Sequence, residues 1–292
     1  MLMREDFFES SGPCTKLYLE DCLDGMGRHL AAESVSVVVT SPPYNLGIPY
    51  KTYNDSISRA EYLTWMEAWA QTVRRVLHPD GSLFLNMGSR PVDPWGPFQV
   101  VERMRAHFVL QNVIHWVKSI YIDHESYGRR IEVNVGHVKP VNSNRFLYDS
   151  HEYIFHLSFH GRVPLDRLAI GVPYKDPSNI TRWDGARKGI RCRGNCWYIP
   201  YQTIKHRDRD RPHPASFPPL LAEMCIRLHG LSRAKLVLDP FMGIGNTAEA
   251  CLKLGVEFIG FEVDPDYFKE AQRRVHVAHE KSVSQNAKAE RP

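Results

Sequence analysis

Short β-branched runs alternate with longer stretches of helical periodicity along the chain. Residues 35–39 (VSVVV) are typical of a buried strand, and the capping box of Ser58 and Glu61 opens a stretch whose apolar residues recur at helical spacing. Residues 78–81 (HPDG) predict a turn, and residues 82–86 (SLFLN) a second strand. The order strand, helix, strand predicts a β-α-β unit. We interpret its aromatic stripe as core: Tyr62, Trp65, Met66, Trp69, Val73 and Val76.

A second unit of this kind lies near the C-terminus. Residues 235–238 read as a strand, residues 247–254 as a helix closed by Gly255, and residues 256–262 as a further strand. Pro218 precedes an apolar-periodic helix just upstream. The pattern predicts an α/β fold: one mostly parallel sheet with helices on both faces, whose ligands bind at the carboxyl ends of the strands.

The loop after the first strand is chemically distinctive. It reads TSPPYNLGIP over residues 40–49, so two consecutive prolines stiffen it and remove two backbone donors. The Ser41 hydroxyl and the Pro42 carbonyl can accept hydrogen bonds, and the Tyr44 ring can stack. Such a loop suits a planar ring that carries an amino group, for instance a nucleobase.

The turn between residues 239 and 247 (DPFMGIGNT) predicts a second ligand site. Gly243 and Gly245 let the backbone approach a ligand, the helix start offers free N–H groups, and Glu262 can accept from both hydroxyls of a ribose. Residues 243–248 (GIGNTA) also match the dinucleotide fingerprint G-x-G-x-x-A, which leaves a nucleotide-dependent oxidoreductase as an alternative. Only thirty residues follow Glu262, however, and these are too few to complete a dinucleotide domain.

Three sequence blocks resemble one enzyme family. TSPPYN at residues 40–45 resembles the catalytic loop of the DNA amino-methyltransferases, and DPFMGIG at residues 239–245 is similar to their S-adenosylmethionine (SAM) loop. HPASFP at residues 213–218 resembles the block that precedes the SAM loop when the catalytic loop comes first in the chain. This order is that of the family's β class.

The resemblance implies a Rossmann-like methyltransferase that moves a methyl group from SAM to the exocyclic amino group of a flipped-out base. Because the loop begins with Ser41, cytosine-N4 is favoured, with adenine-N6 as the alternative. The resemblance implies that Asp21 lies near the cofactor, but N-capping of a helix is an equally good interpretation of this residue. The implied catalytic residues are Ser41, Pro42, Pro43 and Tyr44, and the implied cofactor-binding residues are Asp21, Asp239, Phe241, Gly243, Gly245, Asn246, Thr247 and Glu262.

Positive charge gathers in one segment. Residues 160–211 contain twelve Lys and Arg against five Asp and Glu, a net charge of +7, whereas the whole chain carries +4. Interleaved with Trp197, Tyr198 and other aromatics, the segment indicates a footprint for DNA phosphates, although a solvated loop is the simpler alternative. It also occupies the slot of the target-recognition region in the β class. The candidate DNA-binding residues are Arg182, Arg187, Lys188, Arg191 and Arg193.

These blocks divide the chain as follows. Residues 1–159 form the catalytic half, 160–211 the target-recognition region, 212–281 the SAM-binding half, and 282–292 a tail expected to be disordered. The role of the insertion at residues 119–135 stays open.

Composition sets the remaining limits. The chain has 292 residues, 43% of them apolar, with neither an eighteen-residue apolar run nor a signal peptide, which favours a cytoplasmic protein. Six cysteines make no disulfide framework, and Cys192 and Cys196 lack the second pair of a zinc ribbon. His206 and His213 could complete a four-ligand site with these two cysteines, but we expect no metal. The expected partner is double-stranded DNA, with a homodimer and a cognate restriction nuclease as further possibilities. A catalytically inactive DNA-binding relative is a second alternative.

Overall fold

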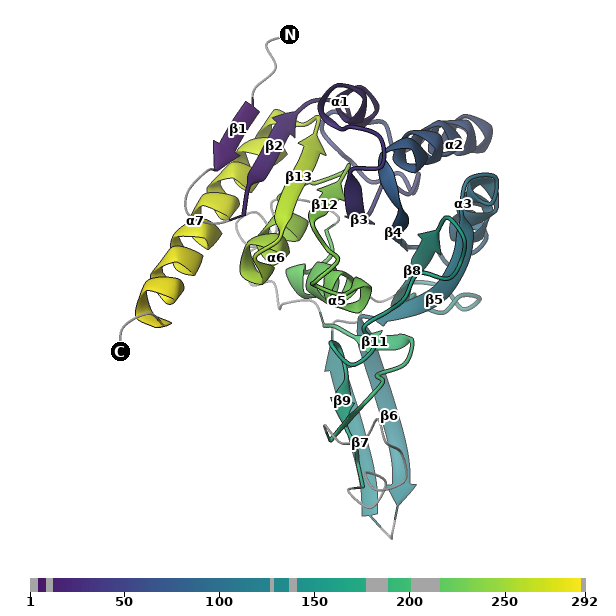
Figure 1. Ribbon diagram of the computed structural model, residues 1–292. Coiled ribbons are helices and arrows are strands. Elements are labelled where there is room, and N and C mark those ends of the chain that lie inside the picture. Colours follow the sequence, from purple (N-terminus) through teal and green to yellow (C-terminus); the bar gives the residue numbers. More distant parts are fainter. Residues whose placement is uncertain are drawn as a thin grey trace.

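The computed structural model describes residues 5–8, 13–126, 129–136, 141–176, 189–200 and 216–289. Its main sheet has nine strands in the order β1-β2-β13-β12-β3-β4-β8-β5-β11 (Figure 1). The neighbouring strands β2, β13, β12, β3 and β4 run parallel to one another. Strand β8 is antiparallel to β4 and β5, and β1 is an antiparallel edge strand. The strands span β1 Glu5–Phe8, β2 Thr15–Leu19, β3 Val35–Thr40, β4 Leu77–Met87, β5 Val109–Val117, β8 His151–Ser158, β11 Cys196–Tyr198, β12 Leu236–Asp239 and β13 Glu257–Glu262.

Helices cover both faces of this sheet, as the pattern predicted. On one face lie α1 (Cys22–His29), α2 (Arg59–Val76) and α3 (Gly96–Met104). The capping box of α2 is present, with the Ser58 hydroxyl accepting from the N–H of Glu61 and the Glu61 carboxylate accepting from the N–H of Ser58. The aromatic stripe of α2 is core except at Trp65, which is only partly buried, since Tyr62, Met66, Trp69, Val73 and Val76 are fully buried.

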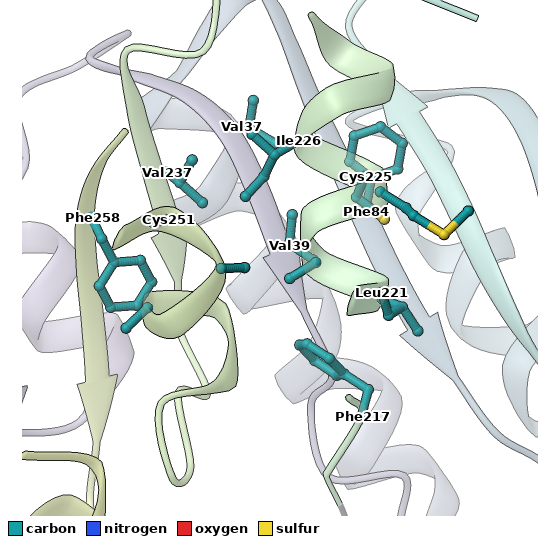
Figure 2. Packing of buried hydrophobic residues seen from close by; sticks show 14 of the residues in the cluster. Val37, Val39, Phe84, Phe217, Leu221, Cys225, Ile226, Val237, Cys251 and Phe258 are labelled. Atoms are coloured by element: carbon teal, nitrogen blue, oxygen red, sulfur yellow. The ribbon is translucent and has the colours of Figure 1, made fainter. Parts of the chain in front are cut away.

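The opposite face carries α5 (Pro219–His229), α6 (Asn246–Leu254) and α7 (Pro265–Ala289). Figure 2 shows Val37 and Val39 of β3 facing Ile226 of α5, with Cys251 of α6 nearby. Burial raises the pKa of the Cys225 and Cys251 thiols well above the ordinary value, so these cysteines serve as small apolar core residues.

Two local predictions differ from the structure. The expected turn at residues 78–81 lies inside β4, where the pairing with β3 jumps from Val35–Leu77 to Val37–Ser82, so the turn residues form an irregularity in one strand. The tail expected to be disordered from residue 282 is helical to Ala289, where it continues α7.

The insertion at residues 119–135 forms an antiparallel hairpin. Its strands β6 (Ser119–Ser126) and β7 (Arg129–Gly136) pair with each other outside the main sheet and project away from it (Figure 1). A shorter pair, β9 (Val172–Pro173) and β10 (Ile190–Arg191), comes from the basic segment. No helix in the described part of the chain has an apolar stretch able to span a bilayer.

Candidate active site

The two predicted functional loops leave adjacent strands at the same edge of the sheet. Strand β3 pairs in parallel with β12, so the loops that follow Thr40 and Asp239 both start at the carboxyl edge. The Thr40 hydroxyl donates to Asp239 Oδ1 at 2.7 Å, which ties the two loop starts together. Two sequence blocks about two hundred positions apart thus meet at the place where open α/β sheets bind ligands.

The catalytic loop, residues 40–49, is held from behind by two side chains. The Tyr62 hydroxyl of α2 donates to the Pro43 carbonyl at 2.8 Å. The Asp55 carboxylate accepts from the backbone N–H groups of Asn45, Leu46 and Ile48 at 2.8–3.0 Å, and its residue is only 2% exposed. These contacts satisfy three backbone donors of the loop and hold its shape without a ligand.

In front of the loop, hydroxyl and carboxylate groups form a connected network. The Ser41 and Tyr44 hydroxyl oxygens lie 2.6 Å apart, and the Tyr44 hydroxyl donates to Glu152 Oε2 at 3.1 Å. Asn86 Nδ2 donates to the Tyr44 oxygen and to Glu152 Oε2, both at 2.7 Å. Lys118 Nζ donates to Glu152 Oε1 at 3.0 Å. The Tyr44 hydroxyl is therefore held by hydrogen bonds, while the Tyr44 ring offers a surface for stacking.

The prediction from sequence missed three members of this network: Asn86, Lys118 and Glu152. Asn86 lies near the carboxyl end of β4 and Lys118 directly follows β5. Glu152 begins β8, which runs antiparallel to both neighbours, so its first residues reach the same edge as the ends of β4 and β5. A polar residue at the end of each predicted strand was the available signal for Asn86 and Lys118, whereas Glu152 required knowledge of strand direction.

The cofactor loop, residues 239–247, is built around two carboxylates, of which Asp239 is buried and Glu262 partly buried. Asp239 accepts from Thr40, from the Thr247 hydroxyl at 2.6 Å and from the Phe241 N–H at 3.2 Å, and burial raises its pKa to about 6. Glu262 accepts from the N–H of Gly243 at 2.9 Å and of Asp264 at 2.8 Å, and burial raises its pKa to about 7. Both carboxylates thus fix the backbone of the turn at a desolvation cost.

These residues fit a ligand that carries hydrogen-bond donors. Each Glu262 oxygen accepts one backbone N–H, and a carboxylate oxygen can accept a second donor such as a ribose hydroxyl. Asn246 Nδ2 donates to the Phe217 carbonyl at 2.6 Å, while its buried Oδ1 has no partner among the described residues. Phe241 packs against Trp65 and Trp69 of α2. The donor and acceptor set suits the ribose and amino-acid parts of SAM.

The glycines of the cofactor loop have a backbone reason to be there. Gly243 and Gly245 have φ values of 55° and 82°, in the left-handed region that other residues rarely adopt. A Cβ on Gly245 would meet the Cβ of Ala271 in α7 at 3.3 Å. For Gly245, close packing against a neighbouring helix is therefore one reason for glycine, and its contact with a ligand stays a prediction.

Asp21 occupies the capping position that was its alternative interpretation. Its side chain accepts from the N–H groups of Leu23 and Asp24 at the start of α1, at 2.8 and 3.3 Å. Beside it, Glu20 is buried and pairs with Arg28 and with His29, whose Nε2 lies 3.0 Å from its carboxylate. A contact of Asp21 with the cofactor stays a prediction.

The basic segment is only partly described. Arg182, Arg187 and Lys188 lie outside the described residues, as do His206 and His213, and the described residues hold no metal-binding cluster. The guanidinium of Arg193 donates to the Ile170 carbonyl at 2.9 Å and is half-buried, whereas Arg191 is exposed.

One aromatic of this segment is wrongly predicted. Trp197 is only 1% exposed, because β11 joins the main sheet beside β5, so Trp197 is core and no part of a DNA-facing surface. Tyr198, next to it, is 37% exposed.

Comparison with known proteins assigns the family. The model of the N6/N4 DNA methylases matches residues 35–273. The chain belongs to this family. Membership identifies it as a DNA methylase and removes the oxidoreductase alternative, whose glycine fingerprint the cofactor loop shares.

Individual relatives agree with this assignment. The methylase is 26% identical over 248 residues to type II methyltransferase M.HpaI of Haemophilus parainfluenzae, covering 85% of this chain and 70% of that protein. It is 24% identical to DNA adenine methyltransferase YhdJ of Escherichia coli K12, covering 90% and 84%.

Two solved structures share the fold. The PvuII DNA methyltransferase, described as cytosine-N4-specific, aligns with a TM-score of 0.63 at 19% identity over 94% of both chains. The SAM complex of TTHA0409, a putative DNA modification methylase of Thermus thermophilus, aligns with a TM-score of 0.57 at 23% identity, covering 90% and 93%. The Rossmann-like methyltransferase fold expected from the sequence is therefore confirmed.

Proposed function

We propose that this DNA methylase transfers a methyl group from SAM to the N4 amino group of a flipped-out cytosine in double-stranded DNA. The observation that carries the proposal is the junction of β3 and β12. It places a rigid acceptor loop, containing Ser41, directly beside a turn that is bound by Glu262, whose carboxylate suits a ribose. SAM is the cofactor of this family of enzymes, and the related TTHA0409 structure holds it.

The chemistry follows from the weakness of an exocyclic amine as a nucleophile. Its lone pair is delocalised into the ring, and it becomes available when both N–H bonds point at acceptors. Ser41 Oγ and the Pro42 carbonyl supply these acceptors on a loop that Asp55 and Tyr62 hold in place. SAM supplies the electrophilic methyl group. No covalent intermediate with the enzyme is required, so no cysteine has to lie at this loop.

The Tyr44 ring contributes stacking to the extruded base. Stacking of a base on an aromatic side chain is worth roughly 1–3 kcal/mol, which offsets part of the cost of unpairing and unstacking. The Tyr44 hydroxyl is held by Ser41, Asn86 and Glu152, so the ring has a fixed orientation before DNA binds.

The choice of cytosine-N4 over adenine-N6 rests on Ser41. A loop that begins with Ser is more frequent among the cytosine enzymes of this family, and the PvuII neighbour is named cytosine-N4-specific. The relative YhdJ is named an adenine methyltransferase, so adenine-N6 is the second candidate. Mass spectrometry of nucleosides from DNA methylated by the pure protein decides: N4-methylcytosine supports the proposal, N6-methyladenine selects the second candidate, and 5-methylcytosine would refute the mechanism. Absence of transfer from labelled SAM would indicate an inactive relative.

Contacts with DNA phosphates are assigned to the basic segment, with Arg191 as its best described member. Arg191 is exposed on β10 of the small β9–β10 pair, and its guanidinium donates to the Cys192 carbonyl at 3.1 Å. Charge reversal, Arg191→Glu, should weaken DNA binding and flatten the salt dependence by about 0.9 for each phosphate that is no longer neutralised, with SAM binding unchanged. Affinity and salt slope equal to the parent's would remove Arg191 from the interface.

Cellular context is the remaining part of the proposal. M.HpaI and other relatives are named type II methyltransferases, which supports a restriction-modification role in the cytoplasm with a cognate nuclease. A neighbouring gene whose product cleaves the same sequence, and is blocked by this methylation, would establish it. A homodimer is a further proposal, tested by light scattering with and without DNA.

A further inference from the structure

We infer that Glu152 is the positioning residue of this active site and the terminal acceptor of the proton that the methylated base releases. The inference deepens the proposed function and rests on it. Neither the catalytic loop nor the cofactor loop contains this residue, which comes from the start of β8.

A continuous path of hydrogen bonds leads from the catalytic loop to this carboxylate. The Ser41 and Tyr44 hydroxyl oxygens are 2.6 Å apart, and the Tyr44 oxygen lies 3.1 Å from Glu152 Oε2. Both separations are within hydrogen-bond reach, so a proton can pass along the path without movement of the backbone.

The partners of Tyr44 fix the direction of these bonds. The ionised Glu152 only accepts, so the Tyr44 O–H must donate to it. Asn86 Nδ2 donates to the Tyr44 oxygen, and the remaining lone pair of that oxygen faces Ser41. The Ser41 O–H therefore donates to Tyr44. Asn86 Nδ2 lies at 3.5 Å from Ser41 Oγ, so one lone pair of Ser41 is left for the amino group of the base. Glu152 in this way makes Ser41 an acceptor.

Charge balance requires that one proton leave the methylated base, and the hydrogen-bond path gives that proton a route to Glu152. When the amino nitrogen bonds to the methyl carbon, the S–CH3 bond breaks, its electron pair stays on sulfur, and the positive charge passes to the base. The base becomes neutral by losing one N–H proton to Ser41 Oγ. Ser41 passes its own proton to the Tyr44 oxygen, and Tyr44 passes its proton to Glu152 Oε2. The methylated base is then neutral, and the carboxyl group returns its proton to water after product release.

The surroundings of Glu152 suit an acceptor. Lys118 Nζ binds Oε1, which leaves Oε2 for Tyr44 and Asn86, and the Lys118 and Glu152 side chains are only 17% and 13% exposed. The ammonium group balances the carboxylate charge within this half-enclosed site and holds its orientation.

The test is the substitution Glu152→Gln, measured by single-turnover methylation. Glutamine keeps the shape of the side chain but cannot take up the proton. Its NH2 group would donate to Tyr44 and so reverse the direction of the hydrogen bonds along Tyr44 and Ser41. We expect the methyl-transfer rate to fall about 100-fold, in the range of general acid–base effects, while SAM and DNA dissociation constants stay within twofold of the parent's. A parent-like rate, or a loss confined to binding, would overturn the inference.

A second variant tests the path itself and does not depend on the first. Tyr44→Phe keeps the stacking ring and removes the relay hydroxyl, so it should lose a similar factor in rate, and the double variant should be no slower than either single one. Additive losses would show that the two residues act separately, against the inference. A parent-like Tyr44→Phe rate would overturn it even if Glu152→Gln failed to fold.

A matched control breaks a comparable ion pair elsewhere. Glu223 of α5 binds Lys253 at 2.7 Å and Arg227 at 3.0 Å, away from the loops, and Glu223→Gln should leave the rate unchanged. A parent protein that forms no N-methylated base would overturn the proposed function and the inference with it. An active parent with a fully active Glu152→Gln variant would overturn the inference alone.

Discussion

The catalytic loop and the cofactor loop leave neighbouring strands of one sheet, and in both of them carboxylates bind backbone N–H groups, but only the catalytic loop has its side chains held by hydrogen bonds from other elements. At the catalytic loop, side chains from α2, β4 and β8 converge on Pro43 and Tyr44 from outside the loop. At the cofactor loop, the carboxylates of Asp239 and Glu262 bind backbone N–H groups of the turn itself. The first loop presents reactive side-chain oxygens, whereas the second presents a backbone surface.

The difference has an energetic consequence. The network around Ser41 and Tyr44 is only partly buried, so altering one hydroxyl costs little stability and affects mainly the reaction. Asp239 is 1% exposed and satisfies three donors, so altering it affects the fold as well as the ligand. Substitutions in the two loops should therefore separate rate from stability.

The largest effect is expected for Ser41→Ala. It removes one of the two acceptors for the amino group, and the rate of methyl transfer should fall by about 10²–10³, with unchanged SAM affinity and unfolding midpoint. Single-turnover kinetics with labelled SAM measure the rate. The exposed Ser56 of the same region is the control, since Ser56→Ala should retain the parent's rate. A stability loss as large as the rate loss would contradict the comparison.

A smaller loss, in stability, is expected for Asp239→Ala. The change leaves the Thr40 and Thr247 hydroxyls and the Phe241 N–H without their hydrogen-bond acceptor in the core, at a cost of about 3 kcal/mol in the free energy of unfolding. Denaturant titration of the protein without cofactor measures it. Thr247→Ser keeps the donor and should cost roughly 1 kcal/mol. An unfolding midpoint unaffected by Asp239→Ala would show that this carboxylate does not hold the two loops together.

The pH dependence of SAM binding is the next expected effect. Glu262 has a pKa of about 7 because it is buried, and ribose hydroxyls need its ionised form as acceptor. SAM affinity should therefore weaken as pH falls below 7, by up to tenfold per unit. Calorimetry between pH 5.5 and 8 measures it, and Glu262→Gln should abolish the dependence.

Stability without cofactor should respond to Glu262 in the opposite sense. A carboxyl whose pKa is higher in the folded than in the unfolded protein favours folding at low pH. This contribution is lost as pH rises from 4.5 to about 7, at about 1.4 kcal/mol per unit. If the SAM affinity of the parent protein did not depend on pH, Glu262 would be excluded from the ribose site.

The smallest effect is expected for Gly245→Ala. The residue has φ of 82°, and its Cβ would press on Ala271, so we expect a loss of about 1–2 kcal/mol and a melting temperature lower by a few degrees. Gly27 in α1 is the control, because a Cβ there meets nothing within 4 Å and Gly27→Ala should be neutral or stabilising. Reduced SAM affinity with unchanged stability would instead support the interpretation of Gly245 as a ligand contact.

Much of the fold was predictable because local signals agreed with tertiary packing. The capping box at Ser58, the left-handed closure at Gly255 and the apolar run of β3 each occur as predicted. Trp197 was not predictable, because an isolated Trp in a basic segment has no local sign of burial, and β11 becomes core only by joining β5. Asp21 was ambiguous for a similar reason, since a capping carboxylate and a ligand carboxylate look alike in one sequence.

By itself, the sequence determined the two loops, because two prolines restrict the backbone of one, two glycines permit the left-handed backbone of the other, and the strand before each loop is a local apolar run. Only the tertiary structure decided what surrounds them. The antiparallel direction of β8 brings Glu152 to the edge where Asn86 and Lys118 also end, and the parallel pairing of β3 with β12 brings Thr40 to Asp239. Strand direction and neighbour order depend on the packing of the whole sheet, and no local pattern encodes them.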